Sequence, residues 1–334
     1  MRGRELTKVV KLCDGNGELN SNSIGWARHP IVYCNVQGSF LRKKKWNYWC
    51  MTSPDALFSI TVSHLDYVAV IFVYVFDLKT MKFNEQSVLI PFGRFVNMPD
   101  NVNDPIYVEH KGIRVSLQDT NINVYWPNFY ESKPLQAQFS IKKEPEQESL
   151  NVVIPWGKNQ FQFTSKQVGL PVQGKVNWSQ GEYVFNSNQS FATLDFGRGK
   201  WPYRSTWNWG AASGYSDNHK VGLNLGGQWT EGTGQTENGI TIDHRLHKVH
   251  DELDWIYDQQ NYMKPWIIQT PNSHQVKLMF EPIFERVSRT NALIIQSEVH
   301  QMFGYYHGTI ETDLGHSIEV NKIFGWAEDH KARW

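Results

Sequence analysis

Short runs of apolar or alternating residues recur along the whole chain, and turn-forming residues separate them. Residues 67–76 (YVAVIFVYVF) are apolar throughout, whereas 113–118 (IRVSLQ) and 135–141 (LQAQFSI) alternate. Gly, Asn, Asp and Pro gather between the runs, as in DGNG (14–17) and MPDN (98–101). No long window has the i, i+3, i+4, i+7 spacing of an amphipathic helix. The pattern predicts antiparallel strands in barrels or sandwiches, with fewer than about one residue in five helical, against about a third in average soluble proteins.

The length of the chain, 334 residues, exceeds what one hydrophobic core usually supports. A Lys-Trp-x-Tyr motif occurs at Lys45 and again at Lys200, about half a chain apart, and strands follow each copy. This is either a trace of duplication or a chance match in an aromatic-rich chain. We expect two domains, 1–168 and 169–334, joined by a Gly/Pro-bearing connector at 164–176 (TSKQVGLPVQGKV).

Composition narrows the class of protein. Aromatic residues make up 14% of the chain, which suits sheets, and the 33 basic residues equal the 33 acidic ones. A balanced chain has no overall field for holding nucleic acid, so no nucleic-acid partner is expected. The longest apolar run is too short to span a bilayer as a helix, and the N-terminal residues have no signal-peptide core. With the three cysteines read as reduced thiols (Cys13, Cys34, Cys50), we expect a cytoplasmic protein.

Several long strings resemble the domain of unknown function 2804 family, over residues 12–334. They include SIGWARHP (23–30), LDFGRGKWPYRSTWNW (194–209), TENGITIDHRLHKV (236–249), EVHQMFGYYHG (298–308) and GWAEDHKARW (325–334). A more distant likeness is to carotenoid hydratases, tocopherol cyclases and AttH-like proteins. The resemblance implies an all-β fold of two tandem antiparallel lipocalin-like (calycin-like) β-barrels. It also implies a small apolar ligand, polyene or prenyl in type.

Motifs for cofactor chemistry are missing from the sequence: it has no GxGxxG before a helix, no GxxxxGK[ST], no HExxH and no GxSxG. We therefore expect no cofactor. Residues two apart on a strand share a face, which pairs His64 with Asp66 and Glu298 with His300. On a lumenal face such pairs could work as general acid and base, and in solvent they would be ordinary polar positions. The predicted catalytic residues are Glu298, His300, Asp66 and His64; the similar set Asp243, Arg245 and His247 contributes Asp243 as a ligand-binding candidate.

Two charged segments could form binding sites, but each also has a simpler structural interpretation. Glu328, Asp329 and His330 could supply metal ligands, but neighbouring residues of one strand cannot all face one ion. We expect instead a segment that closes a barrel, and no metal. The basic run Arg42 to Lys45 precedes Trp46 and could hold phospholipid or single-stranded nucleic acid. A solvated loop that enters a strand is the simpler interpretation.

Residues 194–214 (LDFGRGKWPYRSTWNWGAASG) are the richest in candidate chemistry. Strand alternation places Tyr203, Trp207 and Trp209 on one face, and the glycines suggest a barrel corner. Asp195 and Arg198 could pair in the preceding turn. An aromatic wall with a polar anchor is typical of a small-molecule pocket. The predicted ligand-binding residues are Asp195, Arg198, Tyr203, Trp207, Trp209 and Asp243.

These observations leave two functions open. The first is a cofactor-independent hydratase, isomerase or cyclase, in which Asp66 or Glu298 protonates a double bond and His300 adjusts that carboxyl. One cavity would then hold Trp207 and Trp209 together with Glu298 and His300. The second is a carrier that binds an apolar molecule without chemistry; a structural or lipid-surface protein is a third, plainer possibility. The oligomeric state is left open.

Overall fold

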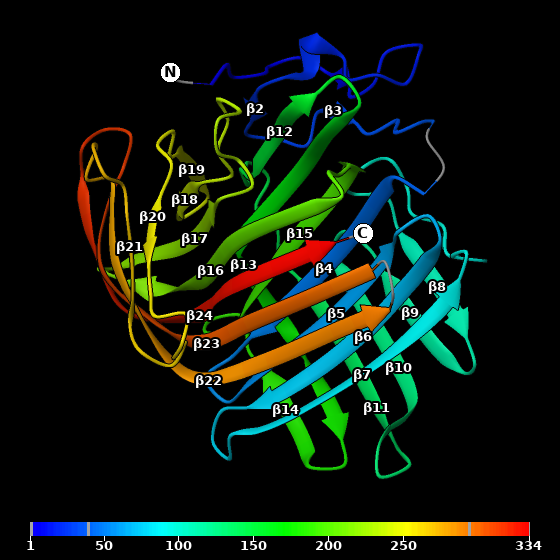
Figure 1. Cartoon of the computed structure of the whole chain (residues 1–334). Coiled ribbons are helices and arrows are strands. Elements are labelled where there is room, and N and C mark those ends of the chain that lie inside the picture. The colour runs from blue at the N-terminus through cyan, green and yellow to red at the C-terminus, as the bar shows by residue number, and fades with distance from the viewer. Residues whose placement is uncertain (1–2, 39–40, 293–294, 334) are drawn as a thin grey trace.

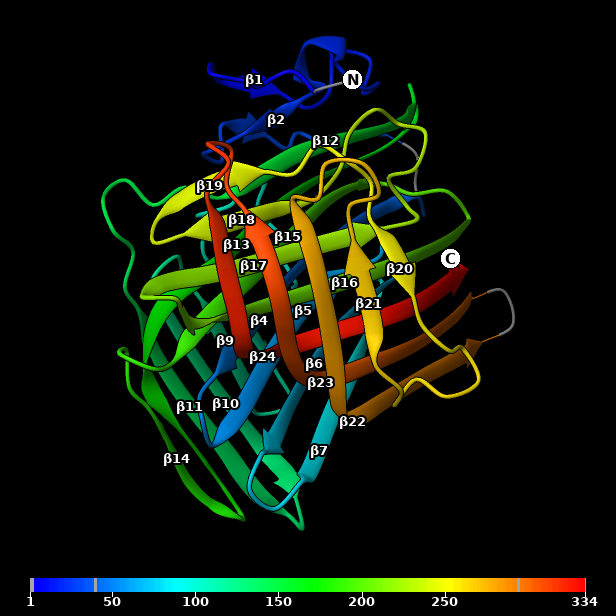
Figure 2. The ribbon, with the colours of Figure 1, turned by 90° about the vertical axis from the view of Figure 1, so that its left-hand side faces the viewer.

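The computed structural model describes residues 3–38, 41–292 and 295–333. Within them the only helical element is the 3-10 turn η1 (Ser21–Ser23), so the prediction of an all-β chain is confirmed. Two large sheets account for most of the strands, and β1 (Val10–Lys11) pairs with β3 (Val32–Tyr33) in a small third one. Both large sheets are antiparallel and strongly curled (Figures 1 and 2).

Within the described residues, the first sheet has thirteen strands. In spatial order its main path is β7 (Lys82–Pro91), β6 (Val68–Asp77), β5 (Ala56–His64), β4 (Lys43–Thr52), β15 (Phe191–Lys200), β13 (Gln160–Trp178), β11 (Lys133–Ile141), β10 (Asn121–Tyr130), β9 (Ile113–Leu117) and β8 (Ile106–His110). β12 (Leu150–Gly157) and β14 (Gly181–Phe185) also pair with β13, and β2 (Trp26–Ala27) pairs with β12.

The second sheet has nine strands in the part of the chain that the structure describes. Their order is β19 (Arg245–Lys248), β18 (Gly239–Ile242), β17 (His219–Gly227), β16 (Arg204–Ser216), β24 (Ser317–Arg333), β23 (Ile295–Glu311), β22 (Val276–Ala292), β21 (Trp266–Gln269) and β20 (Asp254–Ile256). The four long strands in the middle, β16, β24, β23 and β22, carry one end of this sheet beyond its barrel-like core (Figure 1).

Each sheet curls around its own apolar core, and the two sheets pack against each other through their other faces. Phe58 and Val73 point into the first core, and Leu223 and Phe280 into the second. A third cluster joins the sheets and contains Tyr48, Cys50, Leu57, Tyr74, Phe76, Val168, Trp209, Ala211, Phe303 and Trp326. Central strands are thus buried on both sides, which explains why residues 67–76 are apolar without alternation. The predicted fold class, all-β with two tandem antiparallel lipocalin-like β-barrels, is confirmed, and each barrel is present as a curled half-barrel sheet.

Sheet membership does not follow the predicted division of the chain. Residue 168 lies inside β13, a single strand of 19 residues, so the stretch 164–176 is not a connector. β15 returns to the first sheet, and membership changes only between Lys200 and Arg204. The first Lys-Trp-x-Tyr copy lies within β4, and the second begins at Lys200, the last residue of the neighbouring strand β15, where Lys200 is the Cα partner of Lys43. They therefore do not mark equivalent positions of two repeats.

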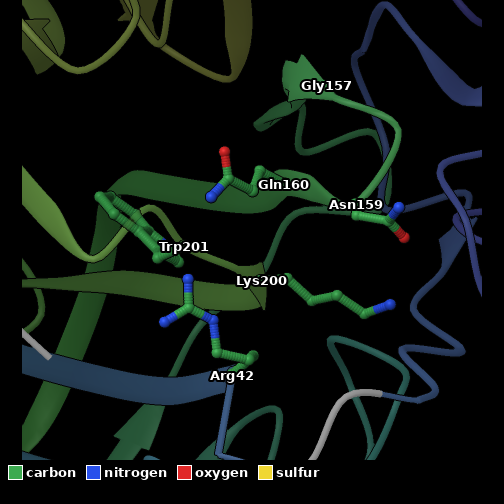
Figure 3. A pocket seen from close by; sticks show the side chains of 6 residues that line it. All are labelled: Arg42, Gly157, Asn159, Gln160, Lys200 and Trp201. Carbon is green, nitrogen blue, oxygen red and sulfur yellow. The ribbon is translucent and has the colours of Figure 1, made fainter.

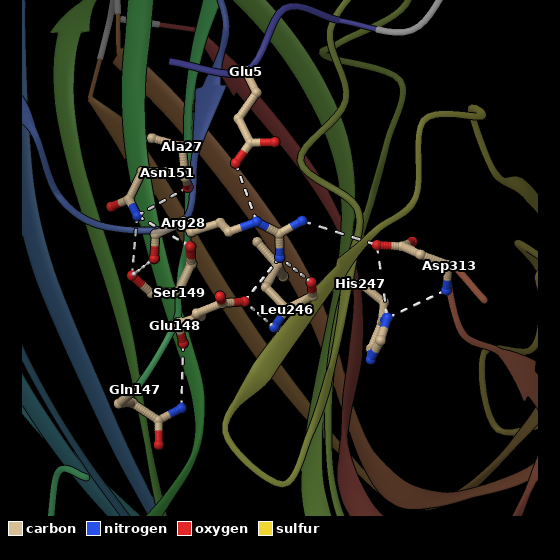
Figure 4. A network of polar contacts seen from close by, with 10 residues as sticks. All are labelled: Glu5, Ala27, Arg28, Gln147, Glu148, Ser149, Asn151, Leu246, His247 and Asp313. Carbon is tan, nitrogen blue, oxygen red and sulfur yellow. Dashed lines mark hydrogen bonds and ion pairs between the residues drawn. The ribbon is translucent and has the colours of Figure 1, made fainter. Parts of the chain in front are cut away.

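A polar network around Arg28 joins the two sheets at one edge (Figure 4). The Arg28 guanidinium lies 2.8 Å from the Glu148 carboxylate and 3.1 Å from that of Glu5, and it donates to the Leu246 carbonyl. The same Glu148 carboxylate accepts from the Leu246 backbone N–H at 2.7 Å. Leu246 belongs to β19 of the second sheet, whereas Glu148 precedes β12 of the first, so this network fastens the two halves together.

Removal of this network is expected to destabilise the protein. Arg28→Ala should lower the free energy of unfolding by about 1–3 kcal/mol, because Glu148 loses a charged partner where it is mostly buried. Urea unfolding measures the change. Lys142→Ala is the control, since the Lys142–Glu144 pair is largely exposed and should contribute little. Equal losses for both variants would contradict the role given to Arg28.

Candidate functional site

Three charged side chains meet between the sheets. Lys166 on β13 places its Nζ 3.0 Å from Asp195 on β15 and 3.1 Å from Glu237, which precedes β18. The ammonium also lies 4.3 Å from the ring centre of Trp209. Burial acts to lower the pKa of Lys166, but the two carboxylates outweigh it and the pKa is raised. Burial raises the pKa of Glu237, and Lys166 only partly offsets this. The cluster therefore holds a cation and two carboxylates away from bulk water.

A fourth ionisable group, Glu328 on β24, faces the same region. Its Oε1 accepts a hydrogen bond from Trp207 Nε1 at 3.2 Å, and its Oε2 accepts a weak one from Gln301 Nε2 at 3.4 Å. Burial raises the pKa of Glu328 to about 7, although Trp207 and the positive charges of Arg286 and Lys166 act against this. A carboxyl that titrates near neutral pH can both donate and accept a proton.

A series of hydrogen-bonded side chains fixes the orientation of Gln301. Its Oε1 accepts from Tyr74 OH at 3.2 Å and lies 3.4 Å from Arg286 NH1. Arg286 in turn forms a bidentate pair with Glu85, at 2.9 and 2.8 Å. Because both donors need an acceptor, the amide NH₂ of Gln301 turns toward Glu328.

Indole rings cover one side of these groups. Trp201 has its ring centre 5.5 Å from that of Trp207, 5.2 Å from Trp229, 4.8 Å from Trp156 and 5.8 Å from Trp46. Trp229 Nε1 donates to Glu237, which links the indole cluster to the buried charges. The arrangement combines flat apolar surfaces with a few fixed polar groups, as small-molecule sites do.

A pocket opens beside this indole cluster (Figure 3). It has a volume of about 270 Å³ and is lined by Arg42, Gly157, Asn159, Gln160, Lys200 and Trp201. Trp207 is only partly buried, and the Asp195 side chain keeps 13% of its surface exposed. Water therefore reaches the edge of the inter-sheet site.

The structure brings three of the predicted ligand-binding residues to this site: Asp195, Trp207 and Trp209. Tyr203 lies just before β16 and is 40% exposed. The predicted Asp195–Arg198 pair does not form. Residues 191–200 are a strand rather than a turn, so positions three apart point to opposite faces.

Arg198 instead faces the first core. It is fully buried, and burial lowers its pKa to about 9. Its guanidinium donates to the carbonyls of Pro99 and Trp46 and to Asn47 Oδ1, and it stacks on Phe196 at 3.7 Å. The proposed role of Arg198 in a ligand wall is therefore corrected: its contacts are those of a structural residue.

Glu298 and His300 do not share a cavity with Trp207, and that expectation is wrong. The register pairs His330 with both Trp207 and Val299, so these three share a face and residues 298 and 300 take the opposite one. There His300 lies between two carboxylates, with Nδ1 2.7 Å from Glu285 and Nε2 3.1 Å from Glu298.

The remaining predicted residues lie in turns or, for His64, at the last position of β5. Asp66 has a φ of 76° between β5 and β6; its backbone N–H donates to His64 Nδ1 at 3.1 Å and its carboxylate lies 3.4 Å from Lys43. Lys43 and the rest of the basic run up to residue 45 begin β4. Asp243 bonds to His219 at 3.1 Å in the β18–β19 turn, with 52% of its side chain exposed. None of the contacts found for these turns in the described residues reaches the indole cluster.

Sequence reasoning missed Lys166 and Glu237 altogether and considered Glu328 only as a metal ligand. Glu328 and His330 share a face while Asp329 takes the other, as alternation requires. His330 packs on Trp207 at 3.9 Å, and burial lowers its pKa to about 3. No group of three or more His, Cys, Asp or Glu side chains suited to a metal occurs within residues 3–38, 41–292 and 295–333. One signal in the sequence could have identified Glu328. It is an ionisable residue inside a strand segment, 325–330, that has apolar residues on both faces.

Two curled antiparallel sheets, packed back to back around a polar and aromatic centre, define a lipocalin-like two-sheet protein. The chain belongs to the domain of unknown function 2804 family, whose profile matches residues 3–334. No curated protein matches the sequence. In the described part of the chain, no helix is long and apolar enough to cross a membrane.

Two solved structures of CghA share this fold at low sequence identity. The structure of CghA with Sch210972 is 8% identical, with a TM-score of 0.52 over 87% of this chain and 88% of that one. A second CghA structure is 7% identical, with a TM-score of 0.50 over 89% and 90%. A protein assigned as AttH from Nitrosomonas europaea is 11% identical, with a TM-score of 0.39 over 86% and 92%.

Proposed function

We propose that this protein binds a small, largely apolar molecule between its two sheets and that Glu328 exchanges a proton with it. The observation that carries this proposal is a buried carboxyl with a pKa of about 7 that is hydrogen-bonded to the Trp207 indole. The fold is shared with CghA, which was crystallised with the compound Sch210972, and this agrees with a ligand in such a protein.

The chemistry that fits is a cofactor-independent hydration, isomerisation or cyclisation. Protonated Glu328 would donate to a double bond, and the carboxylate left behind would accept a proton later in the cycle. The faces of Trp207 and Trp209 would stabilise positive charge that develops on the ligand. Lys166 holds the carboxyl groups of Asp195 and Glu237 in place beside this centre.

Loss of one indole is expected to weaken binding. Trp207→Ala should lower the affinity for the bound compound about tenfold or more, because a stacked aromatic surface is removed. Native mass spectrometry and lipid extraction of the purified protein identify the compound, and calorimetry measures its affinity. Tyr203→Ala is the control, since Tyr203 is 40% exposed. Unchanged affinity in Trp207→Ala would place the ligand elsewhere and end this proposal.

A further inference from the structure

The outer face of one wall of the first sheet is rich in side-chain amides. This wall consists of β8, β9, β10, β11, β13 and β14 (Figure 1). Along three neighbouring strands, the residues between the amides, such as Val124 and Phe139, point into the first core. The amides alternate with them and therefore share the opposite face: Asn121, Asn123, Gln136, Gln138, Gln173 and Asn177.

Two grooves run over this face. The first has a volume of about 570 Å³ and crosses β8, β9, β10 and β11. The second has a volume of about 560 Å³ and crosses β10, β11, β13 and β14. They meet at Asn123 and Gln138, which line both grooves and are direct cross-strand partners. Together they form the amide groove, a continuous strip over six strands that is roughly 24 Å long.

The amide groove carries little net charge. Among the described residues that line it, the cations are Arg114 and Lys175, and the acid is Glu109. Arg114 is the cross-strand partner of Glu109, and its guanidinium lies 4.7 Å from the ring centre of Tyr125. Lys175 pairs with Glu182 at 3.2 Å. A nucleic acid or an anionic lipid surface would need uncompensated cations, so the groove suits an uncharged molecule.

The fold alone does not explain these amides. Asn is depleted in strands, yet three of the six are Asn, and threonine or lysine would serve on a solvated face. Each amide has two N–H donors and a carbonyl acceptor. Four of them form no hydrogen bond within the described residues and offer these groups to a ligand: Asn123, Gln136, Gln138 and Gln173.

We propose that the amide groove binds a neutral oligosaccharide. Sugar hydroxyls both donate and accept, as side-chain amides do, and amides on facing strands lie close enough to hold hydroxyls of one chain of sugars. Tyr107 lines the β8 end of the groove and is 59% exposed, so its flat ring can cover the apolar face of a sugar. Strand faces bind oligosaccharides in other β-folds. A peptide would instead add to a sheet edge or fill an apolar groove.

This proposal does not rest on the inter-sheet site. The lining of the amide groove, as far as the structure describes it, shares no residue with that site. The failure of either proposal leaves the other standing.

The test is calorimetric titration of the full chain with four neutral oligosaccharides: cellohexaose, maltohexaose, xylohexaose and mannohexaose. We expect at least one to bind with a dissociation constant of about 1 mM or lower that changes little with salt. Asn123→Thr and Gln138→Thr should each weaken that binding about tenfold, because an amide that bonds to sugar hydroxyls is lost. Both variants should melt no lower than the unchanged chain, since threonine favours strands.

Gln86→Thr is the matched control. Gln86 is an exposed amide on β7 of the same sheet and does not line the groove, so its loss should leave the affinity unchanged. Any of three results would overturn the proposal. The first is that none of the four sugars binds at millimolar concentration, and the second is equal weakening in Gln86→Thr. The third is a dimer in analytical ultracentrifugation that is lost in Asn123→Thr, without sugar binding, which would make this face an interface between copies of the chain.

Discussion

Replacing Lys166 with methionine is expected to lower the free energy of unfolding by about 3–5 kcal/mol. Lys166 is 5% exposed and pairs with both Asp195 and Glu237, which are themselves 13% and 2% exposed. Without the ammonium, two carboxylates remain buried near each other with no compensating charge. Chemical denaturation at pH 7 measures the loss. It should shrink as pH falls, because protonation of the two carboxylates relieves their repulsion.

Two further variants isolate this cause. Lys175→Met removes a cation from the exposed pair with Glu182 and should change stability by less than about 1 kcal/mol. In a Lys166→Met chain that also carries Asp195→Asn and Glu237→Gln, much of the stability should return, since the stranded charges are gone. If the single variant is as stable as Lys175→Met, or if its loss does not depend on pH, Lys166 does not hold the buried charges as described.

The strands were predictable from sequence because each is a short apolar or alternating run between turn residues. Their partners were not. β15 lies between β4 and β13, and its pairing with β4 joins residues almost 150 positions apart. Nothing in the local pattern of 191–200 contains that information. The error over Arg198 has the same origin, since the glycines at 197 and 199 favoured a turn where the chain continues as a strand. In the fold these glycines let Trp46 and Gln162 approach the backbone closely.

The site was only half predictable for a related reason. Trp207 and Trp209 alternate plainly, so their shared face could be read from the sequence. Residues 295–306 carry apolar side chains on both faces, however, so parity alone cannot tell which face meets the other sheet. The catalytic role was therefore given to Glu298, whereas the buried acid is Glu328. Lys166 lies beside Gly169 and Pro171 in a stretch that resembles a connector, which hid its position inside β13.

Glu328→Gln is expected to change how stability depends on pH. The pKa of Glu328 is raised from 4.5 to about 7 in the folded chain, so the fold favours the neutral carboxyl. That contribution is fully present below the unfolded pKa and is lost as pH rises through about 7. Glutamine stays neutral throughout. The stability of the variant relative to the unchanged chain should therefore rise between pH 4.5 and pH 8, by on the order of 3 kcal/mol.

The shifted pKa of His330 makes stability depend on pH in the opposite direction. This histidine is present in both the unchanged chain and the Glu328→Gln variant. Its pKa is lowered from 6.5 to about 3, so its contribution is present above 6.5 and is lost as pH falls. The comparison of the two chains by urea unfolding at a series of pH values removes this effect to first order. A relative stability that does not change with pH would show that Glu328 has an ordinary pKa, and the proton-transfer proposal would lose its basis.

The same substitution separates an enzyme from a carrier. Glutamine keeps the size of Glu328 and can still accept from Trp207, so the affinity for the bound compound should change by less than about threefold. Proton transfer is lost, and turnover of that compound should fall on the order of a hundredfold or more. Lys142→Gln, on the exposed surface, should leave both quantities unchanged. The protein would be a carrier if it binds the compound tightly, converts it at no measurable rate and still shows the pH dependence of stability expected for Glu328. The buried acid would then affect only the binding affinity. Equal turnover in Glu328→Gln would instead move the catalytic acid to another residue, with Glu237 the next buried carboxyl in contact with an indole.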